Sequence, residues 1–430
     1  MNSAAAPAPT DWKAAAMQKR LRRRYAAERR FRLFGMLAVV LSAAFLAFLL
    51  VTMVANGWRG FLRTEIAVSL DFPAMQLGVR PGQLASPGAD LALSSAGLED
   101  KVALAIDAAY DGRCRCGFNP TSEHAWLAVR DRIKADPSIL SRRESLWLPA
   151  SADIDRGLRG EGPHVVDAEK LQRIGALRTR FNAHFFTESD STDPVAVGIW
   201  GALKGSLLTM LVTFVIAFPV GVLAAIYLEE YAPRNRWTDL IEVSINNLAA
   251  VPSIIFGLLG LAVFLGTWQV FGHSVGPLLP RSAALVGGLT LALMIMPVIV
   301  IASRNAIKSV PPSIRDAALG IGASRIQMVF HHVLPLAMPG ILTGTIIGMA
   351  RALGETAPLL LIGMRAFIVN PPQGLADPAT VLPVQIFLWS DEVSLGFVEK
   401  TSAAIIVLLV FLLAMNGLAI YLRNRFETRW

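Results

Sequence analysis

Long apolar runs separated by charged segments set the pattern of this chain. Six runs approach or exceed the roughly 20 residues that a helix needs to cross a bilayer: residues 34–56, 206–228, 249–271, 282–303, 339–364 and 401–422. Six such runs are too many for the core of one soluble protein. The first lies too far along the chain to be a cleavable signal peptide. The pattern therefore predicts an all-α membrane protein with six transmembrane helices.

The positive charges favour one orientation. Lys and Arg of short loops collect on the cytoplasmic side of a membrane protein. Residues 1–33 form a strongly basic tail, and alternation from there places 18 Lys and Arg in the inside segments against four in the short outside ones. We therefore expect a multi-pass protein of the bacterial inner membrane, with both termini in the cytoplasm.

Composition excludes two classes of protein. Of the 430 residues, 54% are hydrophobic and 17% charged, which is too apolar for a disordered chain and too poor in charge for an average soluble domain. The net charge of +8 raises nucleic acid as a partner, but the basic tail alone carries +7 by count. Next to a span, such a tail favours contact with the anionic lipid bilayer over nucleic acid.

The segment of residues 57–195, between the first two runs, has the size of a domain. Thr64–Phe72 alternates apolar and polar residues, which predicts a strand, and residues 122–134 and 167–185 have helical spacing. We expect a small α+β extracytoplasmic (periplasmic) domain of unassigned role. Its Cys114 and Cys116 have only His124 nearby as a further metal ligand, so we predict no metal site and leave open whether the two thiols pair.

The loop of residues 304–336, after the fourth run, predicts a helix, a turn and a helix. Pro311 and Pro312 begin the first helix, Gly320 and Gly322 permit a sharp turn, and Pro335 is expected to end a second helix at residues 323–333. The small side chains around the turn leave room for another protein to approach. The loop is therefore predicted to bind a soluble partner from inside.

The same loop resembles the EAA loop of ABC-transporter permeases of the type I importer fold. The matching positions are Asp316, Ala317, Ala318, Gly322, Leu334 and Pro335. Two residues depart from the family pattern: Asp316 stands for Glu, and His332 for Ile. The resemblance implies a MetI-like helical bundle over residues 196–430 and a coupling helix that fits a groove of an ATPase subunit. This chain lacks the Gly-rich phosphate loop G-x-x-x-x-G-K-[ST], so we expect it to bind no cofactor and a partner chain to use the ATP.

The fifth run contains an ion pair at helical spacing. Arg351 and Glu355 are four residues apart and would share one helix face. Ionisable groups at membrane depth are costly and usually mark a pathway, and the arginine fork matches phosphate-like oxyanions. We assign Arg351, Glu355 and the adjacent Thr356 to the substrate pathway. The alternative is a salt bridge that only fixes helix packing.

Two further stretches resemble the PstA-type subunit of phosphate-transport permeases: ARALGETAPLLL at residues 350–361 and VPSIIFGLLG at residues 251–260. The similarity spans about residues 199–422. It implies a permease for inorganic phosphate, with a second homologous permease, two ATPase copies and a periplasmic phosphate-binding protein as partners. Arg304 and Asn305 stand where family members carry acidic residues, and the sequence does not explain this change.

Three other readings stay open. The first is a permease for another oxyanion, such as molybdate or tungstate, because Arg351 alone does not discriminate among them. The second is a membrane sensor with an external ligand domain, although every inside segment is short. The third is a membrane enzyme, but the six histidines are scattered and form no catalytic or metal-binding constellation with other residues. We therefore expect a transport subunit without enzymatic chemistry of its own.

Overall fold

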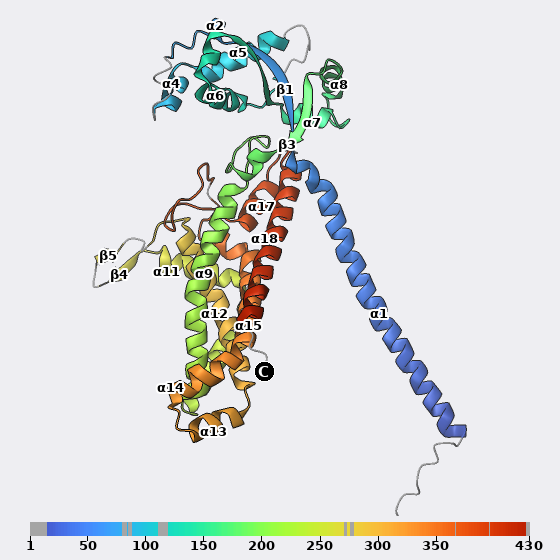
Figure 1. The fold of residues 1–430 in the computed structure, drawn as a ribbon, viewed down its shortest axis with the longest axis vertical. Coiled ribbons are helices and arrows are strands. Elements are labelled where there is room, and N and C mark those ends of the chain that lie inside the picture. The colour runs from blue at the N-terminus through green and yellow to red at the C-terminus, as the bar shows by residue number, and fades with distance from the viewer. Residues whose placement is uncertain are drawn as a thin grey trace, which may run out of the picture. The chain divides into compact units, whose positions relative to one another are not determined.

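The structure is a computed structural model (Figure 1) that describes residues 15–79, 84, 88–110, 119–270, 273–275, 279–365, 367–394 and 396–426. It divides into two compact units, residues 1–56 and 57–430, and each is treated by itself. Cys114 and Cys116 lie outside the described residues, so their pairing stays a prediction.

The first unit is a single long helix, α1 (Ala15–Gly57). The predicted first span, residues 34–56, lies within it. The helix begins earlier, inside the predicted basic tail, because residues 15–34 contain no Gly or Pro and are rich in strong helix formers. The tail and the span are therefore one continuous element.

The segment after α1, which we call the inserted domain (residues 57–195), contains a three-stranded antiparallel sheet in the order β2-β1-β3. The strands are β1 (Leu62–Asp71), β2 (Arg143–Pro149) and β3 (Leu177–Phe181). The helices around them are α2 (Phe72–Met75), α4 (Ala89–Ser95), α5 (Leu98–Tyr110), α6 (Ala125–Ala135), α7 (Ala152–Gly157) and α8 (Val165–Arg173). Short 3-10 turns lie at Trp58–Phe61, Pro137–Ser141 and Ala183–Phe186.

Two of the three elements predicted here are confirmed. The alternating stretch forms β1, whose Ile66, Val68 and Leu70 are fully buried, and α6 matches the first predicted helix. The second predicted helix, residues 167–185, is wrong beyond Arg173. Gly175 adopts a positive φ of 70° that ends the helix, and the alternating residues after it pair with β1 as β3.

The rest of the second unit is a bundle of helices. Its long members are α9 (Trp200–Ile226), α12 (Ala284–Lys308), α15 (Leu334–Gly354) and α18 (Gly396–Phe426). Shorter helices are α10 (Arg236–Ala249), α11 (Ser253–Phe264), α13 (Pro312–Gly320), α14 (Arg325–Gln327), α16 (Ala357–Leu361) and α17 (Leu382–Ser390). Two π-helical turns, η4 (Tyr227–Tyr231) and η5 (Met328–Val333), extend α9 and precede α15. A small hairpin pairs β4 (Trp268–Val270) with β5 (His273–Val275).

The predicted third span, residues 249–271, is not one helix. Among its described residues after Ala249 only α11 is helical and Trp268–Val270 forms β4, while α10 ends at Ala249 and meets α11 at an angle of 106°. Pro252 explains the break, because proline lacks an N–H and disfavours helical geometry in the residue before it. With 12 residues, α11 spans about 18 Å and cannot cross a bilayer of about 30 Å alone.

Helix α12 lies at the centre of the bundle and packs against α9 and α15. Small residues let the helices approach. A Cβ at Gly288 would lie 2.5 Å from Val212, and one at Gly340 would lie 2.7 Å from Ala306. Two glycines of the fifth run, Gly340 and Gly344, therefore lie in a close helix contact and face Ala306 and Ala302.

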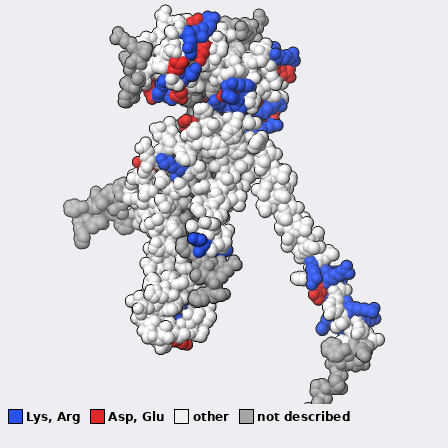
Figure 2. All heavy atoms as spheres, viewed as in Figure 1, with Lys and Arg blue, Asp and Glu red and all other residues white. Residues whose placement is uncertain are grey.

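The apolar helices and the distribution of charged residues over the surface are those expected of a membrane protein. Within the described residues, five helices are long and apolar enough to cross a membrane, or six if α10 and α11 form one broken span. Figure 2 shows Lys, Arg, Asp and Glu gathered over the inserted domain and the first turns of α1, whereas the flank of the bundle on this face is nearly bare of charge. The predicted class, a mostly helical membrane protein, is confirmed.

Candidate functional site

The predicted ion pair of the fifth run is present, but it lies at a break between two helices. Arg351 is in the last turn of α15, and Glu355 follows the helix in an extended conformation (φ −80°, ψ 122°). The Nε of Arg351 donates to Oε1 of Glu355 over 3.4 Å. The expectation of one continuous helix through this run is therefore wrong. Pro358 supplies the reason, because it cannot donate to the carbonyl four residues earlier.

The three predicted pathway residues come together at this break. Thr356 follows Glu355 and stands at the N-cap position of α16 without a side-chain capping bond. Irregular backbone at membrane depth is tolerated only where protein surrounds it or where it lines a water-filled cavity. The break itself is what the sequence reading missed, although Gly354 and Pro358 on either side signal it.

The exposure of this pair bears on whether it lies in a substrate pathway or only fixes helix packing within the chain. The Arg351 side chain is 47% exposed and that of Glu355 19%. A charge that fixed helix packing would be enclosed by its own chain. This arginine instead lies on a surface of the bundle, where a charged group within a membrane must face another subunit or an aqueous path rather than lipid.

The predicted coupling loop folds as a helix and a turn, with sharply defined ends. Gly322 adopts a φ of 89°, its N–H donates to the Leu319 carbonyl, and that of Ala323 donates to the Ala318 carbonyl. These two bonds make a Schellman motif, which fixes the turn after α13. Ser324 and Gln327 then form a capping box that starts the next helix.

The matched EAA positions lie at the outer end of this loop. Asp316 and Ala317 are exposed on α13, Ala318 is buried beneath them, and Gly322 forms the turn. Leu334 and Pro335 lie farther along. Pro335 does not end the second helix as expected. The helix continues from α14 through η5 into α15, because a wider π-helical turn accommodates the missing N–H and the proline ring.

Four large apolar side chains surround the turn, which the sequence reading did not single out. Ile321 is 82% exposed, and three others on the same loop are also exposed: Leu319, Ile326 and Phe330. Exposed apolar groups concentrated at one place mark a surface for binding another protein. Three neighbouring apolar residues, Ala318, Met328 and Val329, are buried instead, so the sequence alone does not separate the two groups.

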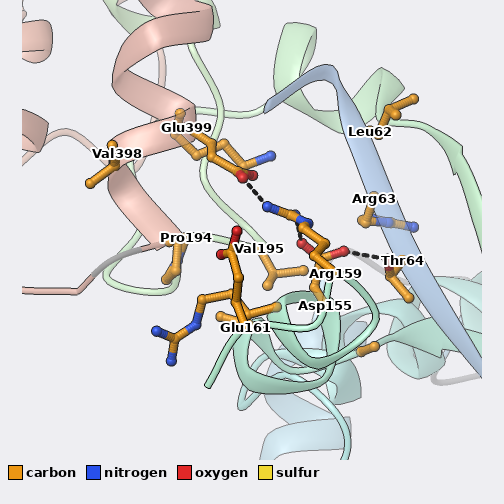
Figure 3. Close-up of a pocket in the computed structure, with 15 residues that line it drawn as sticks. Leu62, Arg63, Thr64, Asp155, Arg159, Glu161, Pro194, Val195, Val398 and Glu399 are labelled. Carbon is orange, nitrogen blue, oxygen red and sulfur yellow. Dashed lines mark hydrogen bonds and ion pairs between the residues drawn. The ribbon is translucent and has the colours of Figure 1, made fainter. Parts of the chain in front are cut away.

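A third polar constellation lies between the inserted domain and the start of α18. Figure 3 shows a chain of contacts that runs from Glu399 through Arg159 and Asp155 to Thr64. These residues border a cavity of about 230 Å³. Lys400, buried beside it, donates to the Gly60 carbonyl over 2.8 Å and lies over the Phe185 ring. These contacts fix the inserted domain on the bundle.

The structure also shows the contacts of Arg304, whose departure from the family pattern the sequence does not explain. Its guanidinium lies 3.4 Å from Glu229 and 3.1 Å from Glu242. It therefore joins the end of α12 to η4 and α10. Asn305 beside it is exposed.

Comparisons with known proteins match two separate stretches of the chain. Residues 199–428 match the family described as binding-protein-dependent transport system inner membrane component, and residues 18–168 match a domain of unknown function (DUF3333). A probable ABC transporter permease protein of Bacillus subtilis, YqgI, is 30% identical over 49% of this chain and 71% of its own.

Two further relatives are phosphate transport system permease proteins. The PstA protein of Yersinia pestis is 31% identical over 52% of this chain and 71% of its own. The PstC 2 protein of Mycobacterium tuberculosis is 33% identical over 45% of this chain and 64% of its own. The resemblance to PstA-type permeases is confirmed for about half of the chain.

Proposed function

The chain belongs to the family of binding-protein-dependent transport system inner membrane components, and from this we propose that it is a permease subunit of an ATP-driven importer of inorganic phosphate. As a member of that family it is a multi-pass inner membrane protein and an ABC importer permease. The observation that best supports phosphate as the substrate is the half-exposed Arg351 at the helix break. The chain that carries it has relatives named as phosphate permeases.

Arg351 would bind phosphate and Glu355 would let it leave. A guanidinium offers two parallel N–H donors to an oxyanion. Among the described residues, Arg351 donates one bond of 3.4 Å, to Glu355, so it has donors left for a ligand. When phosphate moves on, the carboxylate again neutralises Arg351. We place Thr356, the next residue, in the same path.

The loop from Asp316 to Pro335 would receive the ATPase. Its coupling helix α13 lies at the end of the bundle away from the inserted domain (Figure 1), as expected if these parts face opposite sides of the membrane. The exposed apolar side chains around Gly322 supply area for a groove on the partner. Two ATPase copies would each bind one permease, and ATP-driven closure of the ATPase pair would move α13.

The remaining partners follow from our proposal that this chain forms only half of the translocation pathway. An exposed arginine at membrane depth would face an aqueous path that a second permease helps to enclose, and the similarity to both PstA and PstC proteins favours a homologous one. A periplasmic phosphate-binding protein would deliver the substrate to the side of the inserted domain. We place both termini in the cytoplasm, because the basic tail and an even number of spans favour that orientation.

Reconstituted transport complexes decide the substrate. We expect that phosphate, presented with its binding protein, stimulates ATP hydrolysis by the complex in proteoliposomes and that molybdate does not. The same assay without binding protein gives the basal rate. Stimulation by molybdate or tungstate alone would assign the chain to another oxyanion, and stimulation by neither would contradict the importer.

A further inference from the structure

The coupling helix α13 is tied to the bundle by one arginine, Arg315, immediately before Asp316. Its Nε and Nη2 donate to Oε1 of Glu230 over 3.0 and 2.8 Å. Nη1 donates to the Val310 carbonyl over 2.6 Å, and Nη2 also donates to the Ile307 carbonyl over 2.9 Å. The guanidinium is thus held from two sides, by a carboxylate and by backbone oxygens.

These partners come from the ends of two central helices. Glu230 lies in η4, the π-helical turn that prolongs α9, and its side chain is only 7% exposed. Ile307 is in the last turn of α12, where carbonyls lack partners within the helix. Val310 follows in the link to α13. Arg315 therefore joins α9, α12 and α13 at one point.

A neighbouring contact fixes the turn that holds Glu230. Arg304 of α12 binds Glu229, the residue before Glu230, and also Glu242 of α10. Neither carboxylate is on α13. The two consecutive glutamates of η4 thus have separate tasks: Glu229 fixes η4 within the bundle, and Glu230 holds the coupling helix.

The other side-chain contacts that the structure describes for α13 are apolar, through Ile314 and Ala318. Among the residues that the structure describes, Arg315 is the one side chain of α13 that makes an ion pair or a side-chain hydrogen bond to the bundle. Ala318 packs against the helix that follows. Two charge-assisted hydrogen bonds to one oxygen, Oε1 of Glu230, hold this largely enclosed pair together, so we expect a push on α13 to displace η4 with it.

We propose that the contact of Arg315 with Glu230, Ile307 and Val310, the coupling joint, transmits movement of α13 to α9 and α12. Arg315 is then a positioning residue for transport, which acts without touching substrate or nucleotide. This rests on the proposed function, in which an ATPase binds α13. Weakening the joint should leave the ATPase docked and active but separate its turnover from the movement of the bundle.

The test is the ratio of phosphate imported to ATP hydrolysed in proteoliposomes that contain the complete complex. Arg315→Met keeps the length of the side chain and removes its charge and donors. We expect this ratio to fall about fivefold or more, in the range of ordinary coupling energies, with ATPase binding and basal hydrolysis unchanged. Glu230→Gln should act in the same direction. The reversed pair Arg315→Glu with Glu230→Arg should recover part of the ratio.

A matched control is Arg236→Met. Arg236 is exposed at the start of α10 and makes no ion pair with the other described residues, so its ratio should stay at the wild-type value. A wild-type ratio of phosphate imported to ATP hydrolysed in Arg315→Met would overturn the proposed role of the coupling joint. Loss of ATPase binding in both single variants and the reversed pair would also overturn it, because Arg315 would then only hold the fold. If the wild-type complex itself shows no phosphate-stimulated hydrolysis, the proposed function fails and the joint fails with it.

Discussion

Two glutamates that pair with arginine, Glu65 and Glu355, show how residues of the same type take different roles. Glu65 in β1 is 7% exposed and accepts hydrogen bonds of 2.7 Å from both Arg63 and Arg178. Arg351, in contrast, is half exposed and makes one bond of 3.4 Å to Glu355. An exposed ion pair contributes about 0–1 kcal/mol, so a ligand can replace Glu355 at little cost to stability. Replacing either arginine of Glu65 would leave a buried carboxylate short of partners.

Glu65 should make the stability of the inserted domain depend on pH. Burial raises the pKa of Glu65, but the hydrogen bonds and charges of Arg63 and Arg178 outweigh it and hold this pKa below its ordinary value of 4.5. A carboxyl whose pKa is lower in the folded state stabilises the fold at any pH above its unfolded-state pKa. This stabilisation is lost as the pH falls through the folded-state pKa. We expect Glu65→Gln to cost about 2 kcal/mol at neutral pH.

The measurement is the unfolding temperature of the purified chain as a function of pH. The gap between wild type and Glu65→Gln should narrow as the pH is lowered below 4.5. Glu99→Gln, at an exposed position of α5, controls for the general effect of acid. A gap that stays constant over this range would show that the charge of Glu65 has no part in holding the sheet.

At the scale of elements, the contact between α15 and α12 depends on residues without bulk. Gly340 and Gly344 lie one turn apart on α15 and face Ala306 and Ala302, which lie one turn apart on α12. This is the small-residue spacing that lets membrane helices approach closely. Arg351 is on the same helix, so this contact also sets where the arginine lies.

Gly344→Ala should destabilise the bundle, because the added methyl would overlap the Ala302 side chain. Overpacking of this kind costs about 1–3 kcal/mol. Gly417→Ala is the matched control: in the described part of the chain nothing lies within 4 Å of its added Cβ, and alanine is the better helix former. Thermal unfolding in detergent should show a lower midpoint for the first variant and no loss for the second. Equal midpoints would contradict the close helix contact.

The sequence predicts regular elements here better than their interruptions. The alternation of Ile66, Val68 and Leu70 identified β1, and the glycines of the coupling loop identified the turn. The continuation through Pro335 was not predictable, because the π-helical turn that accommodates it depends on how the helix packs. The break at Glu355 was missed because it lies within a long apolar run, where only Gly354 and Pro358 on either side signal it.

The candidate site divides in the same way. The pairing of Arg351 with Glu355 followed from their spacing, and the exposed face of α13 followed from its small residues. Contacts between residues far apart in the chain did not follow. Glu230 and Arg315 are separated by 85 residues, and Arg159 and Glu399 by 240. The local sequence around each residue does not predict which distant residue it contacts.

At the scale of the whole second unit, the inserted domain and the bundle share an apolar core. Phe61 and Phe185 from the two ends of the domain pack with Trp389 of α17 and Phe397 of α18. The contact of Arg159 with Glu399 and the buried Lys400 add polar links at the same place. Because α18 also packs against α15, the domain, the helix that carries Arg351 and the end that carries α13 belong to one connected structure.

The most direct test of this account is phosphate uptake by proteoliposomes that contain the assembled complex with Arg351→Gln. We expect uptake to fall about tenfold or more, as for loss of a charged hydrogen-bonding partner, while the complex purifies intact. Arg173→Gln is the matched control, since Arg173 also pairs with a glutamate four residues away, Glu169, over 3.2 Å but lies in the inserted domain. Uptake at the wild-type rate in Arg351→Gln would contradict the pathway role, and failure of the complex to assemble would make the pair a packing contact instead.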